Sequence, residues 1–200
     1  MSQRHPKEAS LPDTPLIRQY RKIKSQHTNA VLFFRMGDFY EMFFDDAKLA
    51  SRELGLTLTS RNNGAAANVP LAGFPVKAAN DYVRRLVKRG YRVAICEQVE
   101  DPRTTKGIVK RAVIETLTPG SVLSDDLLDK DRNNFLVAML SGEIAGLAAL
   151  DVSTGELFLE TAVRLNVSAA IDRYCPRELV VPEGAHLPKL GDEVMVTRRP

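Results

Sequence analysis

The stretch FFRMGDFYEMFFDD, which runs from Phe33 to Asp46, decides how the first half of this chain folds. Six of its fourteen residues are aromatic, and they are interrupted by a Gly-Asp pair and by one glutamate, Glu41. The run AVLFFRM, which leads into the stretch, is apolar and rich in β-prone residues, so it predicts a buried strand. We expect the Gly-Asp pair to end this strand and the remaining aromatic residues to open a second element.

Beyond the Gly-Asp pair, the spacing predicts a helix of residues 39–54. Asp38 is a suitable N-cap for such a helix, and Gly55 is a suitable residue to end it. Phe39 would then lie at the exposed mouth of the helix, and Glu41 would lie in the first turn, where a carboxylate suits the helix dipole. We therefore expect Phe39 to point outward. The other aromatic residues are expected in the core, namely Phe33, Phe34, Tyr40, Phe43 and Phe44.

The remainder of the first 120 residues alternates between helical and strand patterns. Thr14 and Pro15 are suited to begin an amphipathic helix over residues 14–29. Further elements are expected as a strand in GLTLTSR, a loop or hairpin tip in NNGAAANVPLAGFP, a helix in KAANDYVRRLVKRG, a strand in YRVAICEQV, a charged loop in EDPRTTKGIVKR and a strand in AVIETLTPG. This order predicts a mixed-sheet α/β domain over residues 14–120 that follows a disordered lead-in of residues 1–13.

The second half begins with an acidic, polar segment, residues 121–134, which we interpret as a linker. Strand-like runs at residues 135–140, 144–151 and 156–161 follow, separated by Ser-Gly and Ser-Thr-Gly turns, and they predict an antiparallel meander. A helix in NVSAAIDRY and a strand in RELVVP come next. We expect residues 135–200 to be a second, incomplete α/β domain.

Charge is divided unevenly along the chain. The net charge is +3, but residues 1–120 hold 20 Lys and Arg against 12 Asp and Glu, whereas residues 121–200 hold 8 against 13. A basic half joined to an acidic half suggests that only the first half faces a polyanion such as nucleic acid. No apolar run is long enough to span a bilayer, and the N-terminus lacks a signal-peptide pattern, so we expect a cytoplasmic protein.

Cysteine and histidine are too few and too scattered to predict a metal site or a nucleophile pair. Their spacing matches no common ligand pattern. Cys96 lies in a strand-like segment and is expected to be a reduced, partly buried thiol. The other residues of this kind are Cys175, His5, His27 and His186.

Several segments together resemble the MutS family of DNA mismatch-repair proteins. GDFYEMF resembles the Phe-x-Glu motif of that family, and PLAGFP and VAICEQVEDPRTTKGIVKR with the following TPG resemble its later loops and strands. NNFLVA and LDVSTGELF resemble the start of its connector domain. The resemblance runs from Thr14 to about Glu160, and the few departures (Phe74, Val76 and Lys77) affect no residue with a named role.

The resemblance implies a mismatch-recognition domain followed by the start of an RNase H-like connector. Its partner would be double-stranded DNA that contains a mismatch or a small loop. Phe39 would stack on the mispaired base from the minor groove, Glu41 would hydrogen-bond that base, and Tyr40 would pack inward. Contact with the DNA backbone or simple solvation are both open for Arg61, Lys77, Lys106, Lys110 and Arg111. A solvated helix face is the preferred interpretation for Arg84, Arg85, Lys88 and Arg89.

The family also carries an ATPase, but this chain contains no G-x-x-x-x-G-K-[ST] motif. We therefore expect no catalytic residue and no cofactor in this chain, and we interpret it as an N-terminal fragment. ATP and Mg are implied only for the C-terminal part of longer relatives, as is homodimer formation. The resemblance also implies a partner of the MutL type, which could dock on the connector, and a bacterial cytosolic protein associated with the nucleoid.

Two alternatives remain open from the sequence. Asp151, Glu156 and Glu160 could form a two-metal nuclease site, although Asp151 also suits turn formation and the two glutamates a solvated strand face. The acidic second half could instead be a docking module for a repair partner, with only nonspecific DNA binding by the first half.

Overall fold

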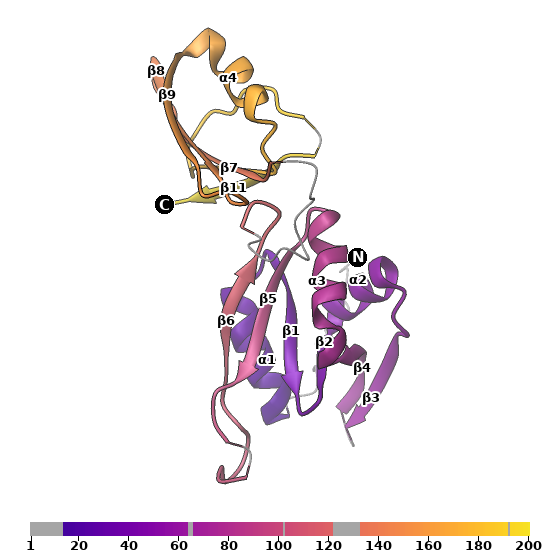
Figure 1. Ribbon diagram of the computed structural model, residues 1–200. Helices are drawn as coiled ribbons and strands as arrows, with labels where there is room; N and C mark the ends of the chain where they lie inside the picture. The colour runs from indigo at the N-terminus through magenta and orange to yellow at the C-terminus, as the bar shows by residue number, and fades with distance from the viewer. Residues whose placement is uncertain (1–13, 64–65, 102, 122–132, 192) are drawn as a thin grey trace, which may run out of the picture. The chain divides into compact units, whose positions relative to one another are not determined.

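The computed structural model describes residues 14–63, 66–101, 103–121, 133–191 and 193–200. The described residues form two compact units, of which the first comprises residues up to 82 and 93–116, and the second residues 83–92 and those from 117 onward. Each unit contains one β-sheet with helices packed on it (Figure 1). The predicted lead-in, residues 1–13, and most of the predicted linker, residues 121–134, lie outside the described residues.

The first sheet has six strands in the order β3-β4-β2-β1-β5-β6. Antiparallel ladders join β1 to β2, β2 to β4 and β3 to β4, whereas β1 and β5 run in the same direction (Figure 1). The sheet is therefore mixed, as predicted. Its strands are β1 (Ala30–Met36), β2 (Phe39–Phe43), β3 (Thr59–Asn63), β4 (Ala66–Pro75), β5 (Arg92–Gln98) and β6 (Arg111–Leu117).

Residues 39–43 form a strand, so the prediction that a helix begins at Phe39 is wrong. Gly37 and Asp38 make a two-residue hairpin between β1 and β2, with Met36 paired to Phe39 and only Gly37 at positive φ, 60°. A glycine at the first central position with positive φ is typical of a type II′ hairpin turn. Ladders on both sides of β2 satisfy its backbone groups, and the helix begins only at Phe44.

Helices pack on both faces of this sheet. The helices of the unit are α1 (Pro15–Gln26), α2 (Phe44–Leu54) and the first part, up to Tyr82, of α3 (Ala79–Lys88), which follows a 3-10 turn, η1 (Val76–Ala78). Phe34 meets Tyr20 of α1 at 5.4 Å between ring centroids, whereas its neighbour Phe33 meets Phe74, which in turn stacks on Tyr82 of α3. Because successive strand residues face opposite sides, α1 and α3 cover opposite faces (Figure 1).

The first helix begins as predicted. The Thr14 hydroxyl accepts a hydrogen bond from the Ile17 amide at 3.3 Å, and Pro15 occupies the first turn. By contrast, NNGAAANVPLAGFP was predicted as a loop or hairpin tip, but most of it forms the end of β3 and the whole of β4. It does lie in a hairpin, because β3 and β4 are antiparallel with Asn63 paired to Ala66. Pairing with both β2 and β3 outweighs the unfavourable strand propensities of its Gly, Asn and Pro residues.

The second unit contains a five-stranded sheet in the order β11-β10-β7-β8-β9. The predicted meander is present, with β7 antiparallel to β8 and β8 antiparallel to β9, and β10 lies parallel to both β7 and β11. Its elements are β7 (Phe135–Leu140), β8 (Ile144–Asp151), β9 (Leu157–Val163), η2 (Arg164–Asn166), α4 (Val167–Tyr174), β10 (Glu178–Pro182) and β11 (Met195–Arg199). The α/β fold class with two mixed sheets is confirmed.

None of the helices in the described segments is long and apolar enough to cross a membrane.

Candidate nucleic-acid interface

Strand β2 places Phe39 and Glu41 on the same face. Successive side chains of a strand alternate between faces, so residues i and i+2 lie on one side, about 7 Å apart. Phe39 is 48% exposed and Glu41 is half-buried, whereas Tyr40 between them is 4% exposed. A helix would have directed these two side chains apart. The strand therefore brings together the outward aromatic ring and the carboxylate.

The prediction of which aromatic residues are core is confirmed. Phe33, Phe34 and Phe43 are completely buried, and Phe44 is half-buried beneath Arg21, whose guanidinium lies 5.0 Å from the ring centroid. Phe39 is the one aromatic residue of the stretch that is exposed.

The β1–β2 turn is fastened to the end of β4. The Val76 amide donates to the Asp38 carbonyl at 3.0 Å, and Phe39 pairs with Pro75. Lys77, in the 3-10 turn that follows β4, is exposed. The β1–β2 turn thereby lies beside a cation that is 38 residues downstream of Phe39 in the sequence.

Glu41 has a small neighbour on one side and an aromatic one on the other. It pairs with Gly73 on β4 and with Phe34 on β1. A Cβ at position 73 would lie 3.0 Å from the Tyr40 carbonyl oxygen and 3.5 Å from the Glu41 Cγ, so glycine leaves room for the glutamate side chain. Phe34 presents a completely buried ring on the same side of the sheet.

Arg111, predicted as a possible contact to the DNA backbone, is buried at 8% exposure. Its guanidinium donates to the Arg35 carbonyl at 2.6 Å and to Gln19 Oε1 and the Val109 carbonyl at 2.9 Å each, and it lies 4.9 Å from the centroid of the Phe34 ring. Burial lowers the pKa of Arg111, an effect that the nearby Cys96 and Glu41 oppose. These internal partners favour a structural role behind the hairpin.

On the opposite face, Glu97 of β5 joins both strands of the hairpin. Its carboxylate accepts a hydrogen bond from the Tyr40 hydroxyl and from Arg35 Nη1, the latter at 3.3 Å. Burial and the adjacent Glu97 raise the pKa of Tyr40 to about 12. Arg35 Nε also donates to the Gly37 carbonyl, so the same group reaches the turn.

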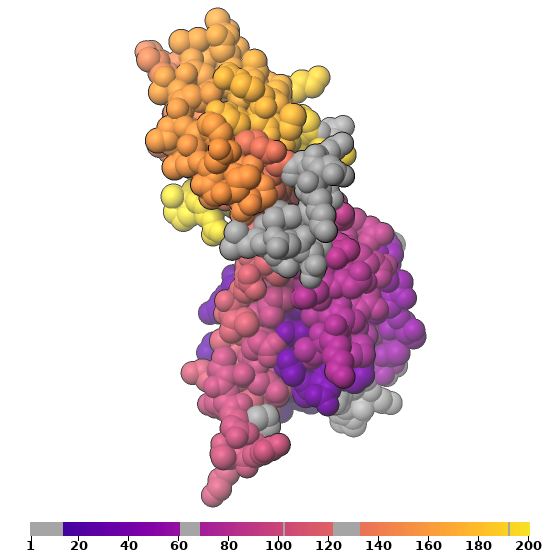
Figure 2. All heavy atoms as spheres, viewed as in Figure 1, coloured from indigo at the N-terminus to yellow at the C-terminus, as the bar shows by residue number. Residues whose placement is uncertain are grey.

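The loop between β5 and β6 carries further exposed cations. It projects from the body of the first unit (Figure 2), and its base is closed by a hydrogen bond from the Val99 amide to the Lys110 carbonyl at 2.9 Å. Lys106 and Lys110 are exposed. Because Arg111 at the end of the loop contacts Arg35 and Met36, the loop starts and ends beside the β1–β2 hairpin.

Sequence reasoning did not include α1 in the basic surface. A groove of about 380 Å³ lies between α1 and β6, and its lining brings Lys22 of α1 to the same groove as Lys110. His27 also lines it. The sequence shows basic residues at helical spacing on α1, but it does not predict that β6 packs beside this helix.

The remaining predicted cations are placed differently. Arg61 pairs with Val69 through its backbone in β3. On α3, Arg84 and Arg85 are half-buried and Lys88 is exposed, and Arg89, which follows the helix, is exposed as well. The preference for a solvated face over contact with phosphate stays a prediction for these four residues.

The three carboxylates of the nuclease alternative have other partners. Asp151 is completely buried, and its Oδ1 accepts hydrogen bonds from the Ser153 amide at 2.9 Å and the Ser153 hydroxyl at 2.6 Å. Glu160 accepts from Arg173 at 3.2 Å and from the Tyr174 hydroxyl at 3.0 Å, and Glu156 precedes β9 instead of lying in it. Within the described residues, no three His, Cys, Asp or Glu side chains gather as a possible metal site.

The thiols also fit simple roles. Cys96 is buried, as predicted, and burial raises its pKa to about 12. Such a thiol is unreactive at neutral pH. Cys175 is exposed.

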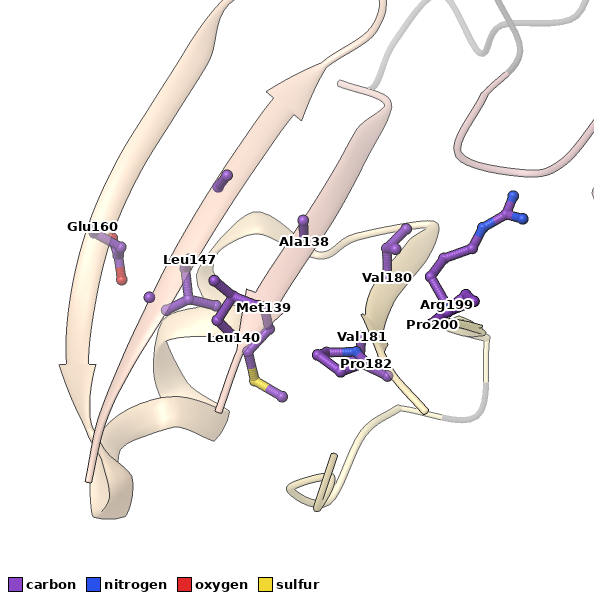
Figure 3. A pocket seen from close by; sticks show the side chains of 12 residues that line it. Ala138, Met139, Leu140, Leu147, Glu160, Val180, Val181, Pro182, Arg199 and Pro200 are labelled. Carbon is purple, nitrogen blue, oxygen red and sulfur yellow. The ribbon is translucent and has the colours of Figure 1, made fainter. Parts of the chain in front are cut away.

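A second groove, of about 380 Å³, lies in the second unit and is predominantly apolar (Figure 3). Ala138, Leu140 and Val180 line it, and Glu160 and Arg199 are its two charged residues. It offers a hydrophobic surface without a set of acid, base or nucleophile groups.

Comparison with known proteins gives the family of this chain. A family model described as MutS domain I matches residues 14–126. Proteins named DNA mismatch repair protein MutS are 52% identical over 173 residues in Desulfatibacillum aliphaticivorans, 48% over 173 residues in Syntrophomonas wolfei and 52% over 147 residues in Fusobacterium nucleatum. These alignments cover 85%, 84% and 72% of this chain but 19%, 20% and 16% of the relatives.

The chain thus spans about one fifth of the length of the curated relatives that it matches. The family model, however, covers more than half of the chain. With its Phe-x-Glu hairpin inside the matched segment, the chain belongs to the MutS family and carries the family's domain I.

Proposed function

We propose that the chain is the lesion-recognising part of a DNA mismatch-repair protein. It binds duplex DNA and inserts Phe39 from the minor groove at a mispaired or looped-out base, while Glu41 hydrogen-bonds that base. The observation that carries the proposal is the common face of Phe39 and Glu41 on β2, with Phe39 48% exposed and Tyr40 turned into the core.

Discrimination follows from the cost of deforming DNA. An apolar wedge that unstacks a base step and kinks the duplex costs a few kcal/mol in paired DNA. A mispaired or looped-out step is already weakened, so the same insertion costs less there. Insertion of Phe39 therefore depends on how easily a base step unstacks and does not require a particular DNA sequence.

Glu41 sharpens this discrimination. A carboxylate near the phosphate backbone is repelled, so its approach is favourable only where a base edge offers a hydrogen-bond donor. Paired bases offer few such donors at the point of insertion. The glutamate thereby penalises insertion into paired DNA more than insertion at a mismatch.

The exposed cations near the hairpin supply affinity that is independent of sequence. Lys77 lies beside the β1–β2 turn, and Lys106 and Lys110 lie on the β5–β6 loop. Contacts of lysine to phosphate release counterions and bind any duplex. Arg111, by its internal hydrogen bonds, supports the hairpin in this proposal instead of binding phosphate.

The test compares Phe39→Ala with the unsubstituted protein, in the full-length protein that contains residues 1–200. Affinity is measured at fixed salt for a G·T or one-base-loop duplex and for the matched duplex. We expect the ratio of the two affinities to fall by about tenfold or more, because a wedge worth a few kcal/mol is lost. Binding to the matched duplex should remain within about twofold.

An unchanged ratio would contradict the proposal. It would favour the second candidate, a docking module for a MutL-type repair partner with nonspecific DNA binding. The observation behind that candidate is the apolar groove of the second unit (Figure 3).

A further inference from the structure

We propose that Glu97 is a positioning residue for mismatch recognition, which acts by holding Tyr40 and Arg35 and thereby fixing the direction of Phe39 and Glu41. The inference rests on the proposed function and deepens it, because it assigns the support of the wedge to a carboxylate on a different strand.

Glu97 lies where it can control both strands of the hairpin. It belongs to β5, which neighbours β1 in the sheet. Its carboxylate accepts a hydrogen bond from the hydroxyl of Tyr40, which lies on β2 at the other side of β1. Arg35 of β1 pairs directly with Tyr40 in the ladder and donates Nη1 to the same carboxylate at 3.3 Å. One side chain thus spans three adjacent strands.

The group also reaches the turn itself. Arg35 Nε donates to the Gly37 carbonyl, while its own backbone carbonyl accepts from Arg111 at 2.6 Å. Arg35 is therefore held from both faces of the sheet. The turn that precedes Phe39 has little freedom to rotate as long as Glu97 holds this guanidinium.

A carboxylate is well suited to this position. It is an acceptor only, with two oxygens, and so it can accept from a phenol and a guanidinium at once. The side chains of Arg35 and Glu97 are 25% and 23% exposed, so the pair is partly shielded from solvent. Tyr40, whose pKa is raised to about 12, remains a protonated donor at neutral pH.

The mechanical consequence lies on the opposite face of β2. The Tyr40 ring packs at 6.0 Å from the Phe33 ring and 5.8 Å from the Phe74 ring, and its hydroxyl is fixed by Glu97 at the far end. A strand anchored through one residue cannot twist about its axis without moving that residue. Phe39 and Glu41, the neighbours of Tyr40, are therefore presented at a fixed angle.

This rigidity affects mismatched DNA selectively. Recognition groups that are held in the productive geometry need no ordering at the moment of insertion. Nonspecific binding to a matched duplex uses the cations and involves no insertion. Loosening β2 should therefore weaken binding to mismatched DNA and leave binding to matched DNA nearly unchanged.

The experiment removes only one hydroxyl. Tyr40→Phe keeps the ring and deletes the hydrogen bond to Glu97. The matched control is Tyr20→Phe, which deletes another tyrosine–carboxylate hydrogen bond, from Tyr20 to Asp46 Oδ2 at 2.9 Å. That bond lies at the other end of β2, where the Tyr20 hydroxyl also meets the Phe43 carbonyl at 3.3 Å.

Both variants are measured in the full-length protein, by thermal unfolding and by affinity for a one-base-loop duplex and its matched duplex. We expect Tyr40→Phe to lower the affinity ratio by about threefold to tenfold, because without this hydrogen bond β2 has to be ordered at the moment of insertion. Tyr20→Phe should lower the unfolding temperature at least as much and leave the ratio unchanged.

A second variant tests the role of Glu97 itself. Glu97→Gln keeps an acceptor oxygen but removes the charge that Arg35 faces, and it should also lower the ratio. In a double-mutant cycle, Glu97→Gln should have a smaller effect in the Tyr40→Phe background than alone, because both changes act on one linked group.

Equal ratios for Tyr40→Phe and Tyr20→Phe, with Phe39→Ala still collapsing the ratio, would overturn the inference and leave the proposed function intact. Fully additive effects in the cycle would overturn it too. A ratio that does not respond to Phe39→Ala would overturn both.

Discussion

At the scale of single residues, the position of a charge in the sequence says little about whether it faces solvent. Arg111 and Lys110 are consecutive basic residues, yet Lys110 is exposed and Arg111 is buried at 8% exposure. The first residue of β6 turns its side chain toward α1 and β1, where three carbonyl or amide oxygens accept its protons. A guanidinium suits that position because its planar fork reaches several acceptors at once.

Arg111→Lys should therefore destabilise the fold. A lysine has the charge but lacks the fork, so at least one of the acceptors on Arg35, Gln19 and Val109 would lose its buried donor. We expect the free energy of unfolding to fall by about 2–3 kcal/mol, the typical cost of unsatisfied buried groups and lost charge-assisted hydrogen bonds. Urea denaturation followed by circular dichroism would measure it.

The control for this substitution is Arg103→Lys, at an exposed position on the β5–β6 loop. It should leave the free energy of unfolding unchanged within about 0.5 kcal/mol. If Arg111→Lys were as stable as the unsubstituted protein but bound all duplexes more weakly, Arg111 would instead be a phosphate contact, and its hydrogen bonds would be incidental.

At the scale of secondary-structure elements, the second unit could be predicted closely from the sequence. Buried residues alternate with exposed or half-buried ones along residues 144–151 of β8, and a turn with Gly155 at positive φ, 80°, separates this strand from β9. Alternation together with turn residues defines both the ends and the inward face of a strand. The predicted runs and the observed strands consequently differ by at most two residues for β7 to β10, whereas β11 was not predicted.

Strand β2 could not be predicted in the same way. Its five residues, Phe39–Phe43, carry aromatic side chains on both faces, because Tyr40 packs toward α3 while Phe43 packs toward α1. A strand buried on both sides shows no alternation, and its apolar run matches a helix equally well. Residues 39–43 form a strand because they pair with β4, about 30 residues downstream. The local sequence does not predict a pairing over that distance.

The turn after β8 provides a test at this scale. Asp151 is completely buried, and hydrogen bonds to its Oδ1 from the Ser153 amide, the Ser153 hydroxyl and the Asn134 amide join the two ends of the β7–β8 pair. Burial would raise the pKa of this carboxyl, but these hydrogen bonds outweigh burial and hold the pKa below its ordinary value of 3.8.

Asp151→Asn should lower the free energy of unfolding of the protein by about 2 kcal/mol at neutral pH, the typical contribution of hydrogen bonds to a charged group. A carboxyl with a lowered folded pKa stabilises the fold above its unfolded pKa of about 3.8 and loses that effect as the pH falls through the folded pKa. The difference between variant and unsubstituted protein should therefore shrink below pH 4. Asp172→Asn, at an exposed position on α4, is the control and should show no such difference.

At the scale of the whole molecule, the sequence identified the kinds of residues in the candidate site but could not place all of them together. Phe39 and Glu41 are two residues apart in any fold, but Lys77 approaches the hairpin only because the Val76 amide bonds to the Asp38 carbonyl. Lys22 joins the basic groove only because α1 packs beside β6. Long-range pairing supplied these neighbours, and composition alone gave only the excess of positive charge in residues 1–120.

That excess should appear as a dependence of binding on salt. Lys22, Lys106 and Lys110 line the groove or the projecting loop, and each contact to phosphate steepens the decline of log affinity with log salt by about 0.9. Replacing any one of them by alanine should therefore reduce the slope by up to about 0.9. The change should be equal for mismatched and matched duplexes, because phosphate positions carry no mismatch information.

Lys48→Ala is the matched control for this series, since Lys48 is an exposed lysine on α2 whose ammonium already pairs with Asp45 at 3.0 Å. Helix α2 follows the end of β2 that lies away from the hairpin turn. The salt dependence of binding by Lys48→Ala should therefore have the same slope as that of the unsubstituted protein. A lysine substitution that changed the affinity ratio and left the slope intact would mean that the cation acts on the mismatch itself. In the proposed function, the uncharged Phe39 discriminates and the lysines supply general affinity. Phe39→Ala should therefore change the affinity ratio at every salt concentration and leave the salt slope for matched DNA unchanged.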